Sequence, residues 1–219
     1  MNKHEKDSLK KYDSIAQSYD TSLDGKFTAQ FKQKMLELCP LSDGDSVLDV
    51  GCGNGRLINN LAQKNAIKAY GVDISPQMIR ECRARYENID FQVSNGEQLP
   101  FDDNSFDTVI ICCVLHHLHN PKGFFLEVYR VLKAGGTLIV GEPCFPIIAR
   151  LFTDWIISPL LKAGDNKLFS HKKLKGFFIE NGFEITQVHK KGIIQIVTGQ
   201  KILLKPPVQT EPQPPKWSR

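Results

Sequence analysis

The sequence lacks both a patterned set of cysteines and an uninterrupted apolar run of membrane-spanning length. Its six cysteines are dispersed and include no Cys-x-x-Cys pair, so neither a disulfide framework nor a zinc motif is indicated. The most apolar stretch, residues 145–164, is interrupted by Arg150, Asp154 and Pro159, which argues against a transmembrane helix. The charged residues 1–11 do not have the pattern of a signal peptide. These absences predict a cytoplasmic protein with reduced thiols.

A large excess of one charge sign is also missing. The net charge is +4, and it arises in residues 151–219, where 11 Lys and Arg stand against 5 Asp and Glu. Aromatic residues do not alternate with these basic residues, so nucleic acid is not an expected partner. The basic third of the chain would favour an anionic acceptor or peripheral contact with a membrane surface.

One stretch, residues 46–57, combines a strand, a glycine turn and the beginning of a helix. Val47, Leu48 and Val50 are apolar, as in a buried strand. Glycines at positions 51, 53 and 55 then permit a sharp turn and a close approach of the backbone to a ligand. Asn54 is expected to cap the helix that follows. A glycine turn at a helix N-terminus suits a ligand of nucleotide size.

A carboxylate about twenty residues further on strengthens this interpretation. Asp73 follows the next apolar run, residues 67–72, at the place where a carboxylate accepts both hydroxyls of a ribose. A dinucleotide fingerprint would require Gly or Ala where this chain has Arg56. Asp49, just before the turn, would repel a pyrophosphate and attract a cation. S-adenosylmethionine (SAM) carries an ammonium and a sulfonium and no phosphate, so it satisfies both conditions.

Alternating strands and helices predict a doubly wound parallel sheet. The segment 106–113 is a near-continuous apolar run, as expected for a parallel strand buried on both faces. Ser75 and Pro76 should begin the helix after the second strand. Ala134-Gly135-Gly136 should end a helix before the fifth strand. Further strands are expected at 67–72, 89–93 and 137–140, helices at 27–39, 124–132 and 170–181, and an antiparallel hairpin at 183–189 and 193–201.

The N-terminal residues form a separate amphipathic element. Tyr12, Ile15, Ala16 and Tyr19 share one face of an expected helix, which either packs on the core or closes over a ligand as a flap. The apolar stripe in 145–164 presents the same choice between core packing and a substrate lid. Its position after the fifth strand favours a lid.

Several short segments occur in a fixed order along the chain. They are Tyr12–Asp20, Val47–Gly55, Leu99-Pro100-Phe101, Phe106-Asp107, Leu115–Leu118 and Val131–Gly136. Together they resemble the motifs of the class I SAM-dependent methyltransferases, in the ubiquinone/menaquinone-methyltransferase-like (methyltransferase type 11) branch that acts on small molecules. The resemblance implies a Rossmann-like α/β fold with a seven-stranded sheet of order 3-2-1-4-5-7-6, in which the last strand is antiparallel.

The resemblance also implies how the domain is divided. A single methyltransferase domain would span residues 1–204, with a helical flap at 1–40 and a lid insertion at 145–170. Residues 205–219 contain five prolines and no periodicity, so they are expected to form a disordered tail.

The same resemblance implies a set of SAM-binding residues. The glycines would line the methionine and ribose, Asp49 would hold the ammonium, and Asp73 would accept the ribose hydroxyls. Asn95 stands where the family often has Asp, so its contact with the adenine amino group would be neutral and weaker. The implied cofactor-binding residues are Tyr12, Tyr19, Asp49, Gly51, Cys52, Gly53, Asn54, Gly55, Asp73, Ile74, Met78, Asn95, Gly96, Glu97, Cys113, Val114 and His117.

Histidines and cysteines gather after the fourth strand, and three roles are open to them. A metal site would need at least three converging ligands, whereas Cys112 and Cys113 should point to opposite faces of a strand. No metal is therefore expected. The histidines either build a structural loop, which is the favoured interpretation, or supply a general base. If a base is required, His116 and His117 are the candidate catalytic residues.

The sequence therefore predicts transfer of the SAM methyl group to a small-molecule acceptor, apolar or amphiphilic, with release of S-adenosylhomocysteine (SAH). The main alternative is a SAM-binding sensor or scaffold without catalysis. An NAD-dependent oxidoreductase is disfavoured by Arg56 and by the terminal hairpin. A protein methyltransferase is disfavoured because an Asn/Asp-Pro-Pro-Tyr motif is missing after the fourth strand.

Overall fold

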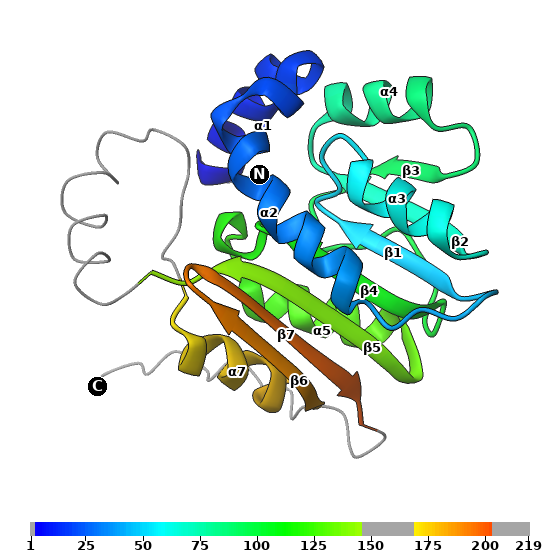
Figure 1. Ribbon diagram of the computed structural model, residues 1–219, viewed down its shortest axis with the longest axis vertical. Coiled ribbons are helices and arrows are strands. Elements are labelled where there is room, and N and C mark those ends of the chain that lie inside the picture. The colour runs from blue at the N-terminus through cyan, green and yellow to red at the C-terminus, as the bar shows by residue number, and fades with distance from the viewer. Residues whose placement is uncertain (1–2, 146–168, 203–219) are drawn as a thin grey trace, which may run out of the picture.

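A seven-stranded sheet forms the centre of the computed structural model, which describes residues 3–145 and 169–202 (Figure 1). The strands are β1 (Ser46–Val50), β2 (Lys68–Asp73), β3 (Asp90–Val93), β4 (Phe106–Cys112), β5 (Leu132–Pro143), β6 (Phe183–Lys191) and β7 (Ile194–Lys201). Their order is β3-β2-β1-β4-β5-β7-β6, which confirms the prediction. Strands β1 to β5 pair in parallel, whereas β7 runs antiparallel to both β5 and β6.

Side chains of each central strand alternate between the two faces of the sheet, and apolar residues point to both. Helices therefore cover both faces. They are α2 (Leu23–Leu38), α3 (Arg56–Lys64), α4 (Pro76–Arg85), α5 (Pro121–Val131) and α7 (His171–Glu180). Ile110 in β4 packs in a cluster with Phe31 of α2, whereas Val109 and Ile111 pack with Phe124 of α5. Helices α2, α3 and α4 therefore lie on one face, and α5 and α7 lie on the other.

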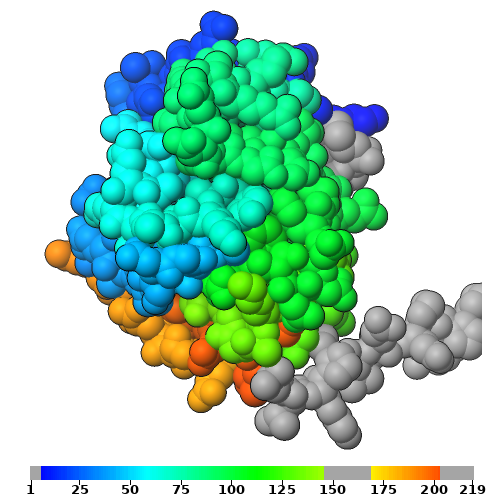
Figure 2. Space-filling view, turned by 90° about the vertical axis from the view of Figure 1, so that its right-hand side faces the viewer, coloured from blue at the N-terminus to red at the C-terminus, as the bar shows by residue number. Residues whose placement is uncertain are grey.

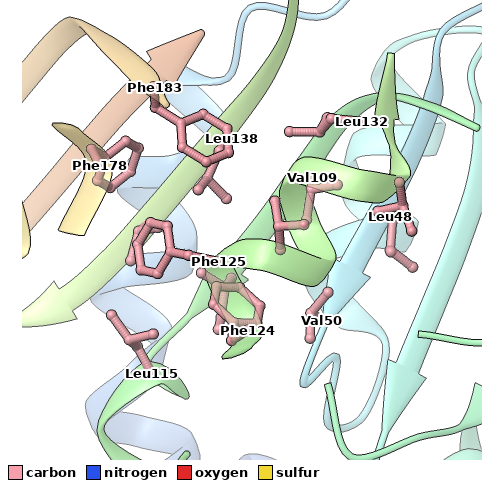
Figure 3. Packing of buried hydrophobic residues seen from close by; sticks show 14 of the residues in the cluster. Leu48, Val50, Val109, Leu115, Phe124, Phe125, Leu132, Leu138, Phe178 and Phe183 are labelled. Atoms are coloured by element: carbon pink, nitrogen blue, oxygen red, sulfur yellow. The ribbon is translucent and has the colours of Figure 1, made fainter. Parts of the chain in front are cut away.

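An aromatic cluster ties the terminal hairpin to the parallel part of the sheet. Figure 3 shows Phe124 and Phe125 of α5 beside Phe178 of α7 and Phe183 of β6. All four rings are essentially inaccessible to solvent, and the rings of Phe125 and Phe178 are 5.4 Å apart. Burying an aromatic ring contributes roughly 1.5–3 kcal/mol, so this cluster holds β6 and β7 against the sheet.

The N-terminal segment is not one continuous helix, contrary to the prediction from its spacing. Helix α1 (Lys3–Ile15) ends at Ile15, and the 3-10 helix η1 (Ala16–Thr21) carries Tyr19. Gly25 allows the close junction that follows, because a Cβ there would lie 1.9 Å from the Tyr19 carbonyl oxygen. The rings of Tyr12 and Tyr19 remain neighbours, with centroids 6.4 Å apart. Figure 2 shows the N-terminal residues, in blue, against the blue-green surface of the following helices.

Element boundaries differ from the sequence prediction, most clearly at α3 and β5. Gly55 rather than Asn54 is the N-cap of α3, and its φ of +71° favours glycine. Strand β5 begins at Leu132, so the expected helix stop at 134–136 lies inside the strand. Phe106 pairs with Leu132 but Thr108 pairs with Thr137, so β5 absorbs its extra residues as a bulge.

The predicted lid and tail fall mainly on residues 146–168 and 203–219, which lie outside the described part of the chain. Within residues 3–145 and 169–202, no helix has the length and apolar character needed to cross a bilayer.

Candidate functional site

A cleft opens where the parallel strands β1, β2 and β4 end. The space within it amounts to about 880 Å³, a volume that includes the open solvent at its mouth. The loops after β1, β2, β3 and β4 form one side, and α1, η1 and α2 form the other. Its lining residues are Ser8, Tyr12, Tyr19, Thr28, Lys32, Val50, Gly51, Gly53, Asp73, Ile74, Met78, Ser94, Asn95, Gly96, Cys112, Cys113, Val114, His117 and Leu118.

The glycine loop after β1 presents backbone rather than side chains to the cleft. The N–H groups of Gly51 and Cys52 donate to the carbonyl of Val72 at 2.8 and 2.9 Å. Gly51 has a φ of +70°, and a Cβ there would lie 2.5 Å from a methyl group of Val114. Both the backbone conformation and the available space therefore require glycine at this position.

Asp73, at the end of β2, is fastened to the glycine loop. One carboxylate oxygen accepts from Gly53 N at 2.8 Å, and the other accepts from Ser75 N at 2.9 Å. Burial raises the pKa of Asp73, and these two backbone bonds oppose the shift. Each carboxylate oxygen can accept a second hydrogen bond, so Asp73 keeps acceptor capacity for a ligand.

Lys32 gives the cleft a cationic group that sequence analysis did not identify. Its ammonium lies 3.5 Å from Asn54 Oδ1 and 5.1 Å from the centre of the Tyr19 ring. Asp49 is buried close by, at 2% exposure. Burial raises the pKa of Asp49 to about 7, Lys32 acts against this shift, and Asp73 adds to it. The lysine at this end of the cleft thus lies near a buried carboxyl group, behind the lining, whose pKa is about 7.

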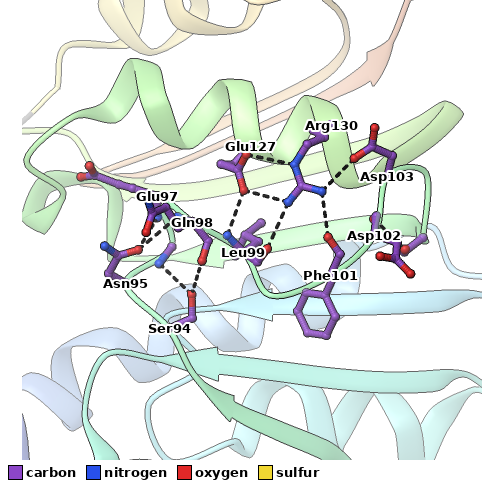
Figure 4. Close-up of polar contacts among 12 residues, drawn as sticks. Ser94, Asn95, Glu97, Gln98, Leu99, Phe101, Asp102, Asp103, Glu127 and Arg130 are labelled. Carbon is purple, nitrogen blue, oxygen red and sulfur yellow. Dashed lines mark hydrogen bonds and ion pairs between the residues drawn. The ribbon is translucent and has the colours of Figure 1, made fainter.

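The loop after β3 uses the Asn95 side chain to close a turn. Figure 4 shows Asn95 beside Glu97 and Gln98, whose N–H groups each donate to Asn95 Oδ1 at 3.1 Å. The family resemblance implies that this side chain meets the adenine amino group. Two backbone donors already bind the Asn95 oxygen. The amide nitrogen of Asn95 therefore has more remaining hydrogen-bonding capacity for a ligand than the oxygen has.

Helix α5 clamps the same loop from behind (Figure 4). Arg130 donates to the carbonyl oxygens of Leu99 and Phe101 at 3.0 and 2.8 Å. Glu127 accepts from Leu99 N at 2.9 Å and binds Arg130 at 2.8 Å. These bonds fix the backbone on which the Asn95 turn is built.

The two candidate histidines have different surroundings. His116 Nδ1 lies 2.7 Å from Glu142, a carboxylate with no solvent exposure that also accepts from Leu115 N. His117 lines the cleft, and its Nε2 lies 3.1 Å from the hydroxyl of Tyr12. Burial, followed by the nearby His116, lowers the pKa of His117 well below its usual value. His117 is therefore uncharged at neutral pH, and one of its ring nitrogens is a hydrogen-bond acceptor.

The prediction that Cys112 and Cys113 point to opposite faces is wrong. Strand β4 ends at Cys112, and Cys113 has a φ of +57°, which interrupts the alternation of side chains. Both thiols line the cleft and pack in one cluster with Ile110. Burial raises the pKa of the Cys113 thiol, which therefore stays protonated. Among the described residues, no three His, Cys, Asp or Glu side chains converge to hold a metal.

The cleft brings together most of the residues implied by the resemblance. Those lining it are Tyr12, Tyr19, Gly51, Gly53, Asp73, Ile74, Met78, Asn95, Gly96, Cys113, Val114 and His117. The implied residues that do not line it are Asp49, Cys52, Asn54, Gly55, Glu97 and His116. The lining residues that were not predicted from the sequence are Ser8, Thr28, Lys32, Val50, Ser94, Cys112 and Leu118. The sequence offered a signal in α2, where Thr28 and Lys32 are polar residues on one face of the helix.

Comparisons with known proteins agree with this architecture. Residues 48–140 match the family model described as "Methyltransferase domain". The demethylmenaquinone methyltransferase of Tropheryma whipplei is 34% identical over 171 residues, covering 73% of this chain and 71% of that protein. The ubiquinone/menaquinone biosynthesis C-methyltransferase UbiE of Hydrogenovibrio crunogenus is 31% identical, covering 70% and 66%.

Among solved structures, a methyltransferase of Haloferax volcanii in complex with the Trm112 activator has a TM-score of 0.76 at 20% identity. The match covers 87% of this chain and 97% of that one, and it shows the shared fold. With the sheet order, the glycine loop and these relatives in agreement, the chain belongs to the class I SAM-dependent methyltransferases, in their ubiquinone/menaquinone-methyltransferase-like branch.

Proposed function

We propose that the cleft binds SAM and that the chain methylates a small apolar or amphiphilic acceptor. The observation that carries this proposal is the bond between Asp73 and the glycine loop, at 2.8 Å from Gly53 N. This bond joins the Asp73 carboxylate to a backbone cradle in one cleft, which supports a role for the carboxylate in binding a ribose. Bound SAM supplies a methyl group already activated by its sulfonium, so the protein's tasks are alignment and exclusion of water.

The adenosine end of the ligand fits the part of the cleft next to β2 and β3. Asp73 would accept the ribose hydroxyls with the acceptor capacity left by its two backbone bonds. Ile74 and Met78, which line the cleft beside it, would pack on the faces of the base. Asn95 and Gly96 would border the edge of the base.

The amino-acid end fits the polar corner formed by Lys32 and Asp49. A methionine moiety carries a carboxylate and an ammonium, and this corner offers one group of each opposite charge. The Lys32 ammonium would hold the carboxylate, and ionised Asp49 would hold the ammonium directly or through water. Asn54, buried at 1% exposure, fixes the Lys32 side chain from behind.

The acceptor would enter on the side where Tyr12 and His117 meet. Between the two candidate bases, His117 is the better placed, because it lines the cleft whereas His116 is engaged by Glu142. For an acceptor with an acidic hydroxyl, His117 Nε2 would receive the proton, with Tyr12 as its neighbour. The demethylmenaquinone methyltransferases among the relatives are named for a quinone acceptor, so a reduced naphthoquinone is our first candidate.

Two measurements test this function. Calorimetry should show micromolar binding of SAM, and Asp73→Ala should weaken it by roughly 2–4 kcal/mol through loss of charge-assisted hydrogen bonds. Incubation with SAM and a reduced, prenylated naphthoquinone should yield SAH and a product heavier by one methylene. Absence of SAM binding would refute the proposal. Binding without turnover across a panel of quinols, phenols and amines would favour the alternative, a SAM-binding sensor.

A further inference from the structure

The N-terminal segment contains two Tyr-Asp pairs, and only their tyrosines line the cleft. The aspartates serve a different purpose. Asp13, in α1, accepts hydrogen bonds from the Ser75 hydroxyl and, at 3.2 Å, from Gln77 N. Ser75 is the N-cap of α4 and lies two residues after Asp73, so Asp13 attaches α1 to the N-terminus of α4.

Asp20, in η1, attaches the same segment to the glycine loop. Its Oδ1 accepts from Asn54 Nδ2 at 2.7 Å, and Arg56 lies 3.5 Å from the same oxygen. The other end of the Asn54 amide faces Lys32 at 3.5 Å. Asp20 thus reaches the polar corner of the cleft through a single buried side chain.

These contacts fasten a segment that covers the cleft. Tyr12 directly precedes Asp13 in the sequence, and Tyr19 directly precedes Asp20. Both tyrosines line the cleft. Both attachments are polar, and the one made by Asp20 is partly exposed to solvent, since its side chain is 47% exposed. Water therefore competes for the Asp20 contact, and the contact can open and close without disturbing the core.

We propose that Asp13 and Asp20 are positioning residues that fasten the N-terminal segment over the cleft and thereby set the rate of SAM and SAH exchange. This inference rests on the proposed binding of SAM in the same cleft. A ligand held between the glycine loop and the two tyrosines leaves only when the segment lifts. Each aspartate therefore acts on the release rate without touching the reacting atoms.

The test is the dissociation rate of SAH from the full chain, measured by stopped-flow displacement. Asp13→Ala and Asp20→Ala should each raise this rate about five- to tenfold, the effect of losing a hydrogen bond. Asp13→Asn and Asp20→Asn should remain near the wild-type rate, because an amide oxygen still accepts the same bonds. Asp7→Ala is the matched control, since Asp7 lies in the same helix as Asp13 and, among the described residues, has no hydrogen bond or ion pair with α4 or the glycine loop.

Hydrogen exchange of the α1 amides provides a second readout that needs no ligand. Exchange should be faster in Asp13→Ala and Asp20→Ala than in the wild type or in Asp7→Ala. Unchanged exchange and unchanged SAH release in both Asp13→Ala and Asp20→Ala would overturn the inference, as would equal acceleration in Asp7→Ala. If the wild type binds no SAH, the proposed function fails and so does the exchange-rate inference. The amide data then show only whether the aspartates hold the segment down.

Discussion

The affinity for SAH should depend on the ionisation of Asp49. Burial raises the pKa of this carboxyl group to about 7, with Asp73 adding to the shift and Lys32 opposing it. Only the ionised carboxylate attracts the ammonium of the ligand. Binding should therefore strengthen as the pH rises through about 7 and weaken as it falls.

The size of the effect follows from linkage. Below the pKa of the free site, affinity falls by up to about tenfold for each pH unit, because the proton must leave before the ammonium is held. Lys32→Met removes the cation that favours the charged form of Asp49, so the midpoint should move to higher pH. It also removes the partner of the ligand carboxylate, which should cost about 1.5–3 kcal/mol.

Calorimetry between about pH 5.5 and 8, in two buffers of different ionisation enthalpy, measures both the affinity and the protons released. The matched ligand is 5′-methylthioadenosine, which keeps the adenosine but lacks the amino-acid group. Its binding should be insensitive to pH in this range and to Lys32→Met. A flat profile for SAH, or the same slope for both ligands, would refute the assignment of Asp49 and Lys32 to the amino-acid end.

Three further substitutions test other parts of the site. Asn95→Asp should bind SAH about fivefold more tightly, because one carboxylate oxygen keeps the hydrogen bonds of the turn while the other accepts from the adenine amino group. Unchanged or weaker affinity by calorimetry would contradict this. Gly51→Ala should lower SAH affinity more than about tenfold, since its Cβ would lie 2.5 Å from Val114. Adding Val114→Ala should recover only part of the loss, because the φ of +70° remains strained. Arg130→Ala should reduce the melting temperature by roughly 5 °C and weaken SAH binding, because the bond to the Leu99 carbonyl is lost. An unchanged melting curve would show that the contacts of Arg130 are dispensable for stability.

Local pattern was enough to predict the elements that build the sheet. The apolar run of β4 has residues for two faces, and the structure buries Val109, Ile110 and Ile111 completely between two layers of helices. Ser75 and Pro76 begin α4 as expected, because the cap is decided by neighbouring residues. The order of the strands does not follow from local pattern, and it was predicted from the family resemblance.

The features that sequence analysis missed depend on contacts between distant segments. Lys32 was not predicted as a site residue because a lysine on a helix is ordinarily solvated. The packing of α2 brings its ammonium near Asn54, 22 positions later in the sequence. The role of Asn95 changed because its oxygen is taken by a turn whose donors no propensity identifies. Cys113 broke the strand alternation because its backbone is left-handed, a conformation uncommon outside glycine.

The position of the cleft wall in the chain has a consequence for how acceptor choice can vary. Tyr12, Tyr19 and Lys32 all precede the stretch 48–140 that matches the methyltransferase domain model. Two relatives can therefore have the whole matched stretch in common and still enclose cavities of different shape. Grafting residues 1–40 from one relative onto another would exchange the entrance while leaving the sheet and its glycine loop in place. Acceptor preference in such chimeras should follow the donor of the graft.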